Sequence, residues 1–123
     1  MTIHLDAAAF KEKVFDFEKG GDWNYLGDLP AVIDFYADWC GPCKAVAPIL
    51  EAISNKYDGK VLIYKVNTDR EQEIAAAFGI QSIPTLVFIP KEGKPRSAVG
   101  ALTKKNFESI FSDVFGLTKG VVA

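Results

Sequence analysis

Two cysteines, Cys40 and Cys43, stand three residues apart in the stretch DFYADWCGPCK (34–44), and the chain has no others. The cysteine pair follows AVIDFYA (31–37). This run is dense in apolar residues, as is typical of a strand buried on both faces. Apolar residues then recur at helical spacing, so we expect a helix over residues 41–57. The pair is therefore predicted to lie at the carboxyl end of a buried strand, where open α/β sheets place their ligand sites.

The start of a helix gives the two thiols different roles. Its unpaired backbone N–H groups and the positive end of its dipole favour a thiolate, and Cys40 comes first in that field. Lowering the pKa of a thiol from about 8.5 to about 7 corresponds to roughly 2 kcal/mol in favour of the thiolate. We therefore expect Cys40 to be the nucleophile. Cys43, one turn later, is placed to resolve a mixed disulfide on Cys40, and Pro42 stiffens the pair.

Three other uses of such cysteines fit the sequence less well. A zinc site would need two further ligands, and the chain offers no third cysteine and a single histidine, His4. A cysteine hydrolase would need a histidine base, whereas His4 is expected at the surface or edge of the first strand. A structural disulfide closing so short a loop would constrain the unfolded chain little. The pattern favours redox chemistry.

The elements that must position the cysteines follow the order β-α-β-α-β-α-β-β-α. The strands are expected at 3–6, 31–37, 60–67, 84–90 and 96–101, and the helices after Asp6, at 41–57, from a Thr68–Glu71 capping box to Gly79, and between Thr103 and Gly116. Parallel strands joined by helices, then a hairpin and a closing helix, predict an α/β fold with a central mixed sheet covered on both faces. We expect residues 1–123 to form one domain.

The charge pattern argues against several partners. The chain has 14 Lys and Arg against 16 Asp and Glu, a net charge of −2, with no basic run or face. This gives no electrostatic basis for binding nucleic acid or an anionic membrane. The amino terminus has no basic start followed by an apolar stretch, and no segment approaches the roughly 18 apolar residues of a membrane span. A cytoplasmic location is expected, or a periplasmic one if a leader precedes this numbering.

The stretch around the cysteines and two later stretches resemble the thioredoxin family. DFYADWCGPCK (34–44) matches the active-site stretch of that family, and SIPT (82–85) and VGAL (99–102) follow in the same order. The likeness covers residues from about 3 to 115. It implies a thioredoxin-like fold and a general protein-disulfide reductase, because Gly-Pro between the cysteines resembles the reducing members more than the oxidases and isomerases.

The resemblance also implies roles by position. Cys40 matches the attacking cysteine and Cys43 the resolving one, with Asp34 as the buried acid beneath Cys43 and Lys65 near it. The implied substrate-binding surface consists of Trp39, Gly41, Pro42, Ile83, Pro84 and Gly100, approached by Gly79 and Ile80. Pro84 would be a cis-proline facing the cysteines. A cis Ile83–Pro84 bond is also indicated by a proline just before an emerging strand beside a peptide site.

Asp34 stands among apolar residues of its strand. Burial there would raise the pKa of its carboxyl, because water no longer solvates the charge, while Lys65 would counter this if it reaches the site. Alternation alone also permits an Asp34 that points outward. A buried Asp34 would suit a base that takes the Cys43 proton as the mixed disulfide resolves.

The resemblance further implies partners. Substrates would be proteins with disulfides, and electrons would come from a thioredoxin reductase or, for an exported form, a membrane electron donor. A monomer needing no metal, flavin or nucleotide is expected. Two alternatives stay open: a disulfide oxidase or isomerase of the same fold, and a binding module whose groove around Pro84 recognises a partner.

The connection from Asp16 to Pro30 is longer than the family usually has, and its extended loop (18–30) carries Trp23 and Tyr25. Because aromatic rings tend to pack, we expect these two to cover an edge of the sheet or the first helix. The alternative is that they shape a surface specific to a partner.

Overall fold

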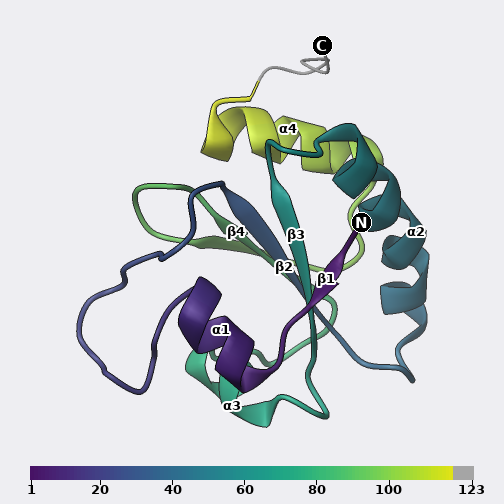
Figure 1. Cartoon of the computed structure of the whole chain (residues 1–123). Helices are drawn as coiled ribbons and strands as arrows, with labels where there is room; N and C mark the ends of the chain where they lie inside the picture. Colours follow the sequence, from purple (N-terminus) through teal and green to yellow (C-terminus); the bar gives the residue numbers. More distant parts are fainter. Residues whose placement is uncertain (118–123) are drawn as a thin grey trace.

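The structure is a computed structural model that describes residues 1–117, so the last six residues of the expected domain lie outside it. Its five strands form one sheet in the order β1-β3-β2-β4-β5 (Figure 1). The strands are β1 (Ile3–His4), β2 (Ala31–Tyr36), β3 (Leu62–Asn67), β4 (Thr85–Ile89) and β5 (Arg96–Val99). β1, β3 and β2 run parallel, whereas β4 is antiparallel to both β2 and β5. The expected mixed sheet and element order are confirmed.

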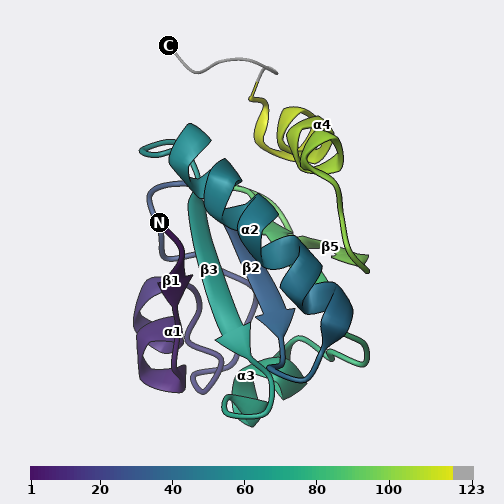
Figure 2. The ribbon, with the colours of Figure 1, turned by 90° about the vertical axis from the view of Figure 1, so that its right-hand side faces the viewer.

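Helices cover both faces of the sheet, as expected. They are α1 (Ala7–Lys13), α2 (Gly41–Lys56), α3 (Gln72–Ala77) and α4 (Lys104–Phe115). Figure 2 shows α2 lying across β3 and β2, with α1 on the opposite side of the sheet. None of the helices in residues 1–117 is long and apolar enough to cross a membrane.

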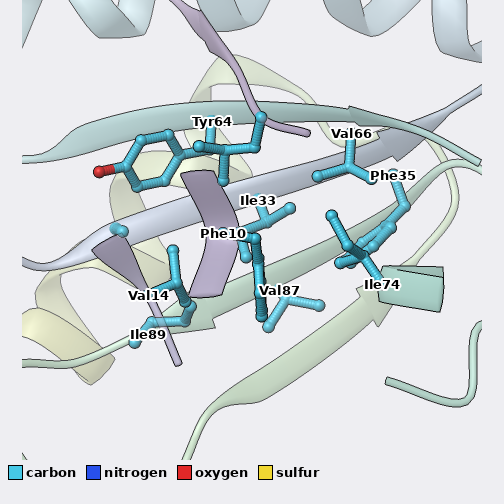
Figure 3. Packing of buried hydrophobic residues seen from close by; sticks show 11 residues of the cluster. Phe10, Val14, Ile33, Phe35, Tyr64, Val66, Ile74, Val87 and Ile89 are labelled. Atoms are coloured by element: carbon cyan, nitrogen blue, oxygen red, sulfur yellow. The ribbon is translucent and has the colours of Figure 1, made fainter. Parts of the chain in front are cut away.

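Two apolar cores hold these layers together. Phe10 of α1 and Ile74 of α3 pack on one face of the sheet, against side chains of β2, β3 and β4 (Figure 3). On the other face, Leu50 of α2 and Phe107 and Phe111 of α4 form the second core. We call these the α1/α3 face and the α2/α4 face.

The central strand β2 contributes to both cores. Ile33 and Phe35 belong to the core of the α1/α3 face, whereas Val32 belongs to the other. Because side chains of a strand alternate, Asp34 faces the same side as Val32, under α2. The strand therefore carries an acidic residue into the layer whose helix bears the cysteines.

Most helix ends follow the expected capping residues. The Asp6 carboxylate accepts the Ala9 N–H (2.8 Å), and Thr103 forms a capping box with Asn106 at the start of α4. Gly116 ends α4 in the left-handed conformation at φ 69°, which glycine adopts without steric cost.

The prediction of a capping box at Thr68–Glu71 is wrong. The Thr68 hydroxyl donates to the Tyr36 carbonyl, and a Glu71 carboxylate oxygen accepts the Ala7 N–H. Both side chains are therefore used by other segments, and α3 begins only at Gln72 without a side-chain cap. The carboxamide oxygen of Asn67 accepts the N–H groups of the turn instead.

The long connection after α1 packs back on the sheet, as predicted. Residues 14–30 contain no helix or strand. The Trp23 ring lies 5.0 Å from Phe15 and 6.1 Å from Phe78, centroid to centroid, and Trp23 and Tyr25 both pack against the core of the α1/α3 face. The Tyr25 hydroxyl also donates to the Leu29 carbonyl at 2.5 Å, which closes the loop locally.

Candidate active site

A disulfide joins Cys40 and Cys43, whose Cα atoms are 5.3 Å apart. It lies where the sequence predicted, between the end of β2 and the start of α2. Cys40 is the N-cap residue of α2, and the Cys43 N–H donates to the Cys40 sulfur at 3.2 Å. Pro42 occupies the first turn, where its missing N–H costs no helical hydrogen bond. The Cys43 amide thus points at the Cys40 sulfur, where it would stabilise a thiolate.

Exposure does not distinguish the two cysteines in this oxidised form, since each is only 4% exposed. The residues around them are open to solvent: Trp39 is 70% exposed, and Gly41 and Pro42 are exposed too. The disulfide therefore lies low among exposed neighbours that a large substrate would touch first.

Trp39 is held in place by a residue that the sequence did not single out. Its indole N–H donates to the Asp69 carboxylate at 3.0 Å. Asp69 follows β3 within two residues, and its own N–H donates to the Asn67 side chain at 3.0 Å. The carboxyl ends of neighbouring parallel strands meet at one edge of a sheet. The polar residues just after β3 could therefore have indicated a partner for Trp39, which follows β2.

The segment before β4 faces this edge. The Ile83–Pro84 peptide bond is cis, as expected, and Pro84 is buried. The Gly100 N–H donates to the Pro84 carbonyl at 2.8 Å, and Gly100 has φ 103°, a conformation that glycine adopts readily and other residues strain to reach. Gly100 is thereby tied to Pro84, which explains why these two predicted site residues lie together.

A shallow hollow of about 380 Å³ connects further predicted site residues. Trp39, Ile80 and Ile83 all line this hollow. Gly79, at φ 63°, ends the turn after α3 and directs the chain toward Ile80. Trp39, Ile80 and Ile83 are thus brought together from segments that follow β2, follow α3 and precede β4.

Asp34 is fully buried, so the outward-facing alternative is excluded. Both of its carboxyl oxygens lack a hydrogen-bond partner. Burial raises the pKa of this carboxyl to about 6, and the positive charge of Lys65 lowers it only partly. The group can therefore exchange a proton near neutral pH.

Lys65 stands directly opposite Asp34 in the β2–β3 register, yet its ammonium lies over another side chain. The Lys65 Nζ is 4.6 Å from the centroid of the Tyr36 ring, a cation–π geometry. The Tyr36 hydroxyl lies 3.3 Å from His4 Nδ1, and His4 is exposed on the edge strand β1, as expected. Sequence reasoning missed Tyr36, because only the strand register brings Tyr36 and Lys65 together.

Comparison with known proteins agrees with this geometry. A family model described as Thioredoxin matches residues 2–113. A thioredoxin of Borreliella burgdorferi is 51% identical over 116 residues, which cover 94% of this chain and 99% of that protein. A thioredoxin of Synechocystis is 41% identical over 108 residues, which cover 88% of this chain and 92% of that protein.

The fold is similar to a solved structure as well. The crystal structure of chloroplastic thioredoxin z, 24% identical, matches with a TM-score of 0.77 over 92% of this chain and 93% of that one. The family model and both relatives span most of this chain, and the paired cysteines lie at disulfide distance. Proteins with disulfides are the substrates that this relationship implies. The chain belongs to the thioredoxin family and is a thiol–disulfide oxidoreductase that reduces disulfides.

Proposed function

We propose that Cys40 is the nucleophile and Cys43 the resolving cysteine of a general protein-disulfide reductase. The observation that carries this assignment is the Cys43 N–H pointing at the Cys40 sulfur from the first turn of α2. The same amide would stabilise a Cys40 thiolate, whereas Cys43 lies inside the helix.

In the reduced protein, the Cys40 thiolate attacks one sulfur of a substrate disulfide. A Cys40–substrate disulfide forms, the substrate S–S bond breaks, and the first substrate thiolate leaves. Cys43 then gives its proton to the Asp34 carboxylate and attacks the Cys40 sulfur, which releases the second substrate thiolate. Two electrons pass to the substrate, and the product on the protein is the Cys40–Cys43 disulfide.

Substrate binding is assigned to the residues that frame the disulfide. Trp39, Gly41 and Pro42 offer exposed surface beside it, and Ile83 offers backbone groups to an extended peptide ahead of the cis-proline. Gly100 leaves room next to Pro84, since it carries no side chain. Lys65 is assigned to the proton transfer, through its charge opposite Asp34.

The remaining assignments rest on the family. The electron donor would be a thioredoxin reductase, or a membrane reductase for an exported form, and a cytoplasmic monomer is the proposed state. The single sheet supports the prediction that the chain forms one domain.

The reduction potential of the Cys40–Cys43 pair tests the proposed direction. We expect a value at the reducing end of the range for this chemistry, close to the roughly −270 mV that is general knowledge for thioredoxins. A value tens of millivolts or more higher would instead identify an oxidase or isomerase.

The alternative function, a binding module without redox activity, needs a separate test. A protein with Cys40→Ser and Cys43→Ser should lose disulfide reduction and every activity that depends on it. A partner-dependent activity that survives in this double variant would favour the binding module.

A further inference from the structure

A second and larger hollow lies on the α1/α3 face of the sheet. Its volume is about 520 Å³, within the range of protein ligand sites. Phe15, Phe17 and Trp23, from the long connection after α1, form one wall. Thr85 of β4 and Val99 of β5 line the hollow from the sheet.

The aromatic wall is built before anything binds. Trp23 packs on both Phe15 and Phe78, at 5.0 and 6.1 Å between ring centroids. The connection is also tied back to the end of α1, where the Leu26 N–H donates to the Val14 carbonyl at 2.9 Å. A preformed wall of this kind spares a bound group the entropy cost of ordering it.

This hollow adjoins the proposed substrate surface. Thr85 directly follows Pro84, and Val99 directly precedes Gly100; Thr85 and Val99 are paired across β4 and β5. Ile80 lines both this hollow and the one beside Trp39. A peptide lying along the cis-proline would therefore reach the hollow within a few residues of its cysteine, at about 3.3 Å per residue.

The chemistry of the lining selects an apolar group. Five aromatic rings and several aliphatic side chains line the hollow together with four uncharged polar residues, and no acidic residue does. Arg96 is its one ionisable lining residue, but Arg96 pairs with Phe88, which belongs to the core of the opposite face. Strand alternation therefore directs the Arg96 side chain away. Val99 is 67% exposed, an apolar side chain left open at the rim.

We propose that this hollow is a substrate subsite that takes a large apolar side chain, preferably aromatic, from the segment of a protein substrate beside its disulfide cysteine. This inference rests on the proposed function and adds a selectivity to it. The long connection that carries Trp23 would then set which disulfides react fastest, while Cys40 and Cys43 supply the chemistry.

Synthetic peptides test the subsite. Each peptide carries one cysteine as a mixed disulfide with 2-thiopyridine, and either Phe or Ser at one position two to six residues to either side. Reduced protein is oxidised to its Cys40–Cys43 disulfide as it releases the peptide thiol and 2-thiopyridone, whose absorbance gives the rate. At one or more positions we expect Phe to raise the second-order rate constant on the order of tenfold over Ser, from the apolar area it buries.

Three variants locate the effect. Ala77→Trp, at an exposed position that lines the hollow, should fill it and reduce the gain from Phe below twofold. Trp23→Ala should also reduce the gain from Phe below twofold, because it removes part of the aromatic wall. If Trp23→Ala does not fold, Ala77→Trp still tests the subsite. Leu26→Ala is the matched control, since Leu26 is 46% exposed in the same connection and does not line the hollow. It should keep the full gain.

Equal rates for Phe and Ser at every position would overturn the subsite, and so would a gain that persists in Ala77→Trp. A dimer in sedimentation that Ala77→Trp abolishes would also overturn it, by identifying a second copy as the occupant. Reduction of 5,5′-dithiobis(2-nitrobenzoate), which is too small to span both sites, separates the two proposals. If the peptides show no gain from Phe but this small disulfide is still reduced, only the subsite is contradicted. If the small disulfide is not reduced either, the proposed function is contradicted.

Discussion

Cys40 and Cys43 carry the same functional group and are equally buried in the disulfide form, so a difference in their reactivity has to come from their surroundings. Cys40 caps α2 and receives the Cys43 N–H, which stabilises negative charge on its sulfur. In the reduced protein we expect brief alkylation near pH 7 to label Cys40 at least tenfold faster than Cys43. Mass mapping of the labelled peptides measures this ratio.

Trapping provides the control for that assignment. Cys43→Ser should accumulate mixed disulfides with substrates through Cys40, because the resolving thiol is gone, whereas Cys40→Ser should accumulate few. Preferential labelling of Cys43, or equal trapping by both variants, would contradict the assigned roles.

The pKa of Asp34 makes stability depend on pH. Burial raises it from 3.8 to about 6, so the native state holds this proton more tightly than the unfolded chain does. The contribution of Asp34 to stability is therefore most favourable below pH 3.8, and it is lost as the pH rises through about 6. The shift corresponds to about 3 kcal/mol at pH 8.

Asp34→Ala removes this buried charge. We expect the oxidised variant to be more stable than wild type at pH 8, by up to about 3 kcal/mol, and to show no such advantage at pH 3. Denaturant melts at both pH values measure the difference, with Asp113→Ala, an exposed acid on α4, as the control. The same Asp34→Ala protein should reduce disulfides more slowly, because the base for Cys43 is missing. Lower stability at pH 8 would contradict the raised pKa.

At the scale of elements, Glu108 joins α4 to α2. Glu108 is buried, and its carboxylate accepts hydrogen bonds from the Lys56 ammonium and, at 3.4 Å, from the Tyr57 hydroxyl. Glu108→Ala should destabilise the protein by about 1–3 kcal/mol, because it leaves the buried Tyr57 hydroxyl without this partner. Urea unfolding measures the loss.

Tyr57→Phe separates the two contacts of that carboxylate. It removes only the hydroxyl, and the ring can still pack on Phe111, 5.0 Å away between centroids. We expect a smaller loss than in Glu108→Ala. If Glu108→Ala unfolds at the same urea concentration as wild type, the carboxylate does not stabilise the contact between α2 and α4.

At the scale of the whole molecule, the sheet order places β2 at the centre and β1 and β5 at the edges. Residues of β2 and β4 are almost all buried, whereas Arg96, Ser97 and Val99 of β5 are exposed. In native-state hydrogen exchange we expect amides of β2 and β4 to exchange only through global unfolding and those of β5 to exchange through smaller openings. Equal protection of β5 and β2 would show instead that the sheet opens as one unit.

Much of this architecture could be predicted because its signals are local. Five residues of β2 are buried, as its apolar run indicated, and Asp6 and Thr103 cap the helices that they precede. The Thr68–Glu71 pattern had the same local form and failed. Its two polar side chains are used by Tyr36 and Ala7, which are distant in sequence, so no short pattern could reveal the competition.

The sequence by itself determined that a cysteine pair begins a helix after a buried strand, because hydrophobic period and helix capping depend on residues within a few positions of one another. Only the tertiary structure decided that Asp69 holds Trp39 and that Tyr36, rather than Asp34, lies beneath the ammonium of Lys65. These contacts depend on strand register and side-chain rotamers, which are settled when separate elements pack together and have no counterpart in the spacing of residues along the chain.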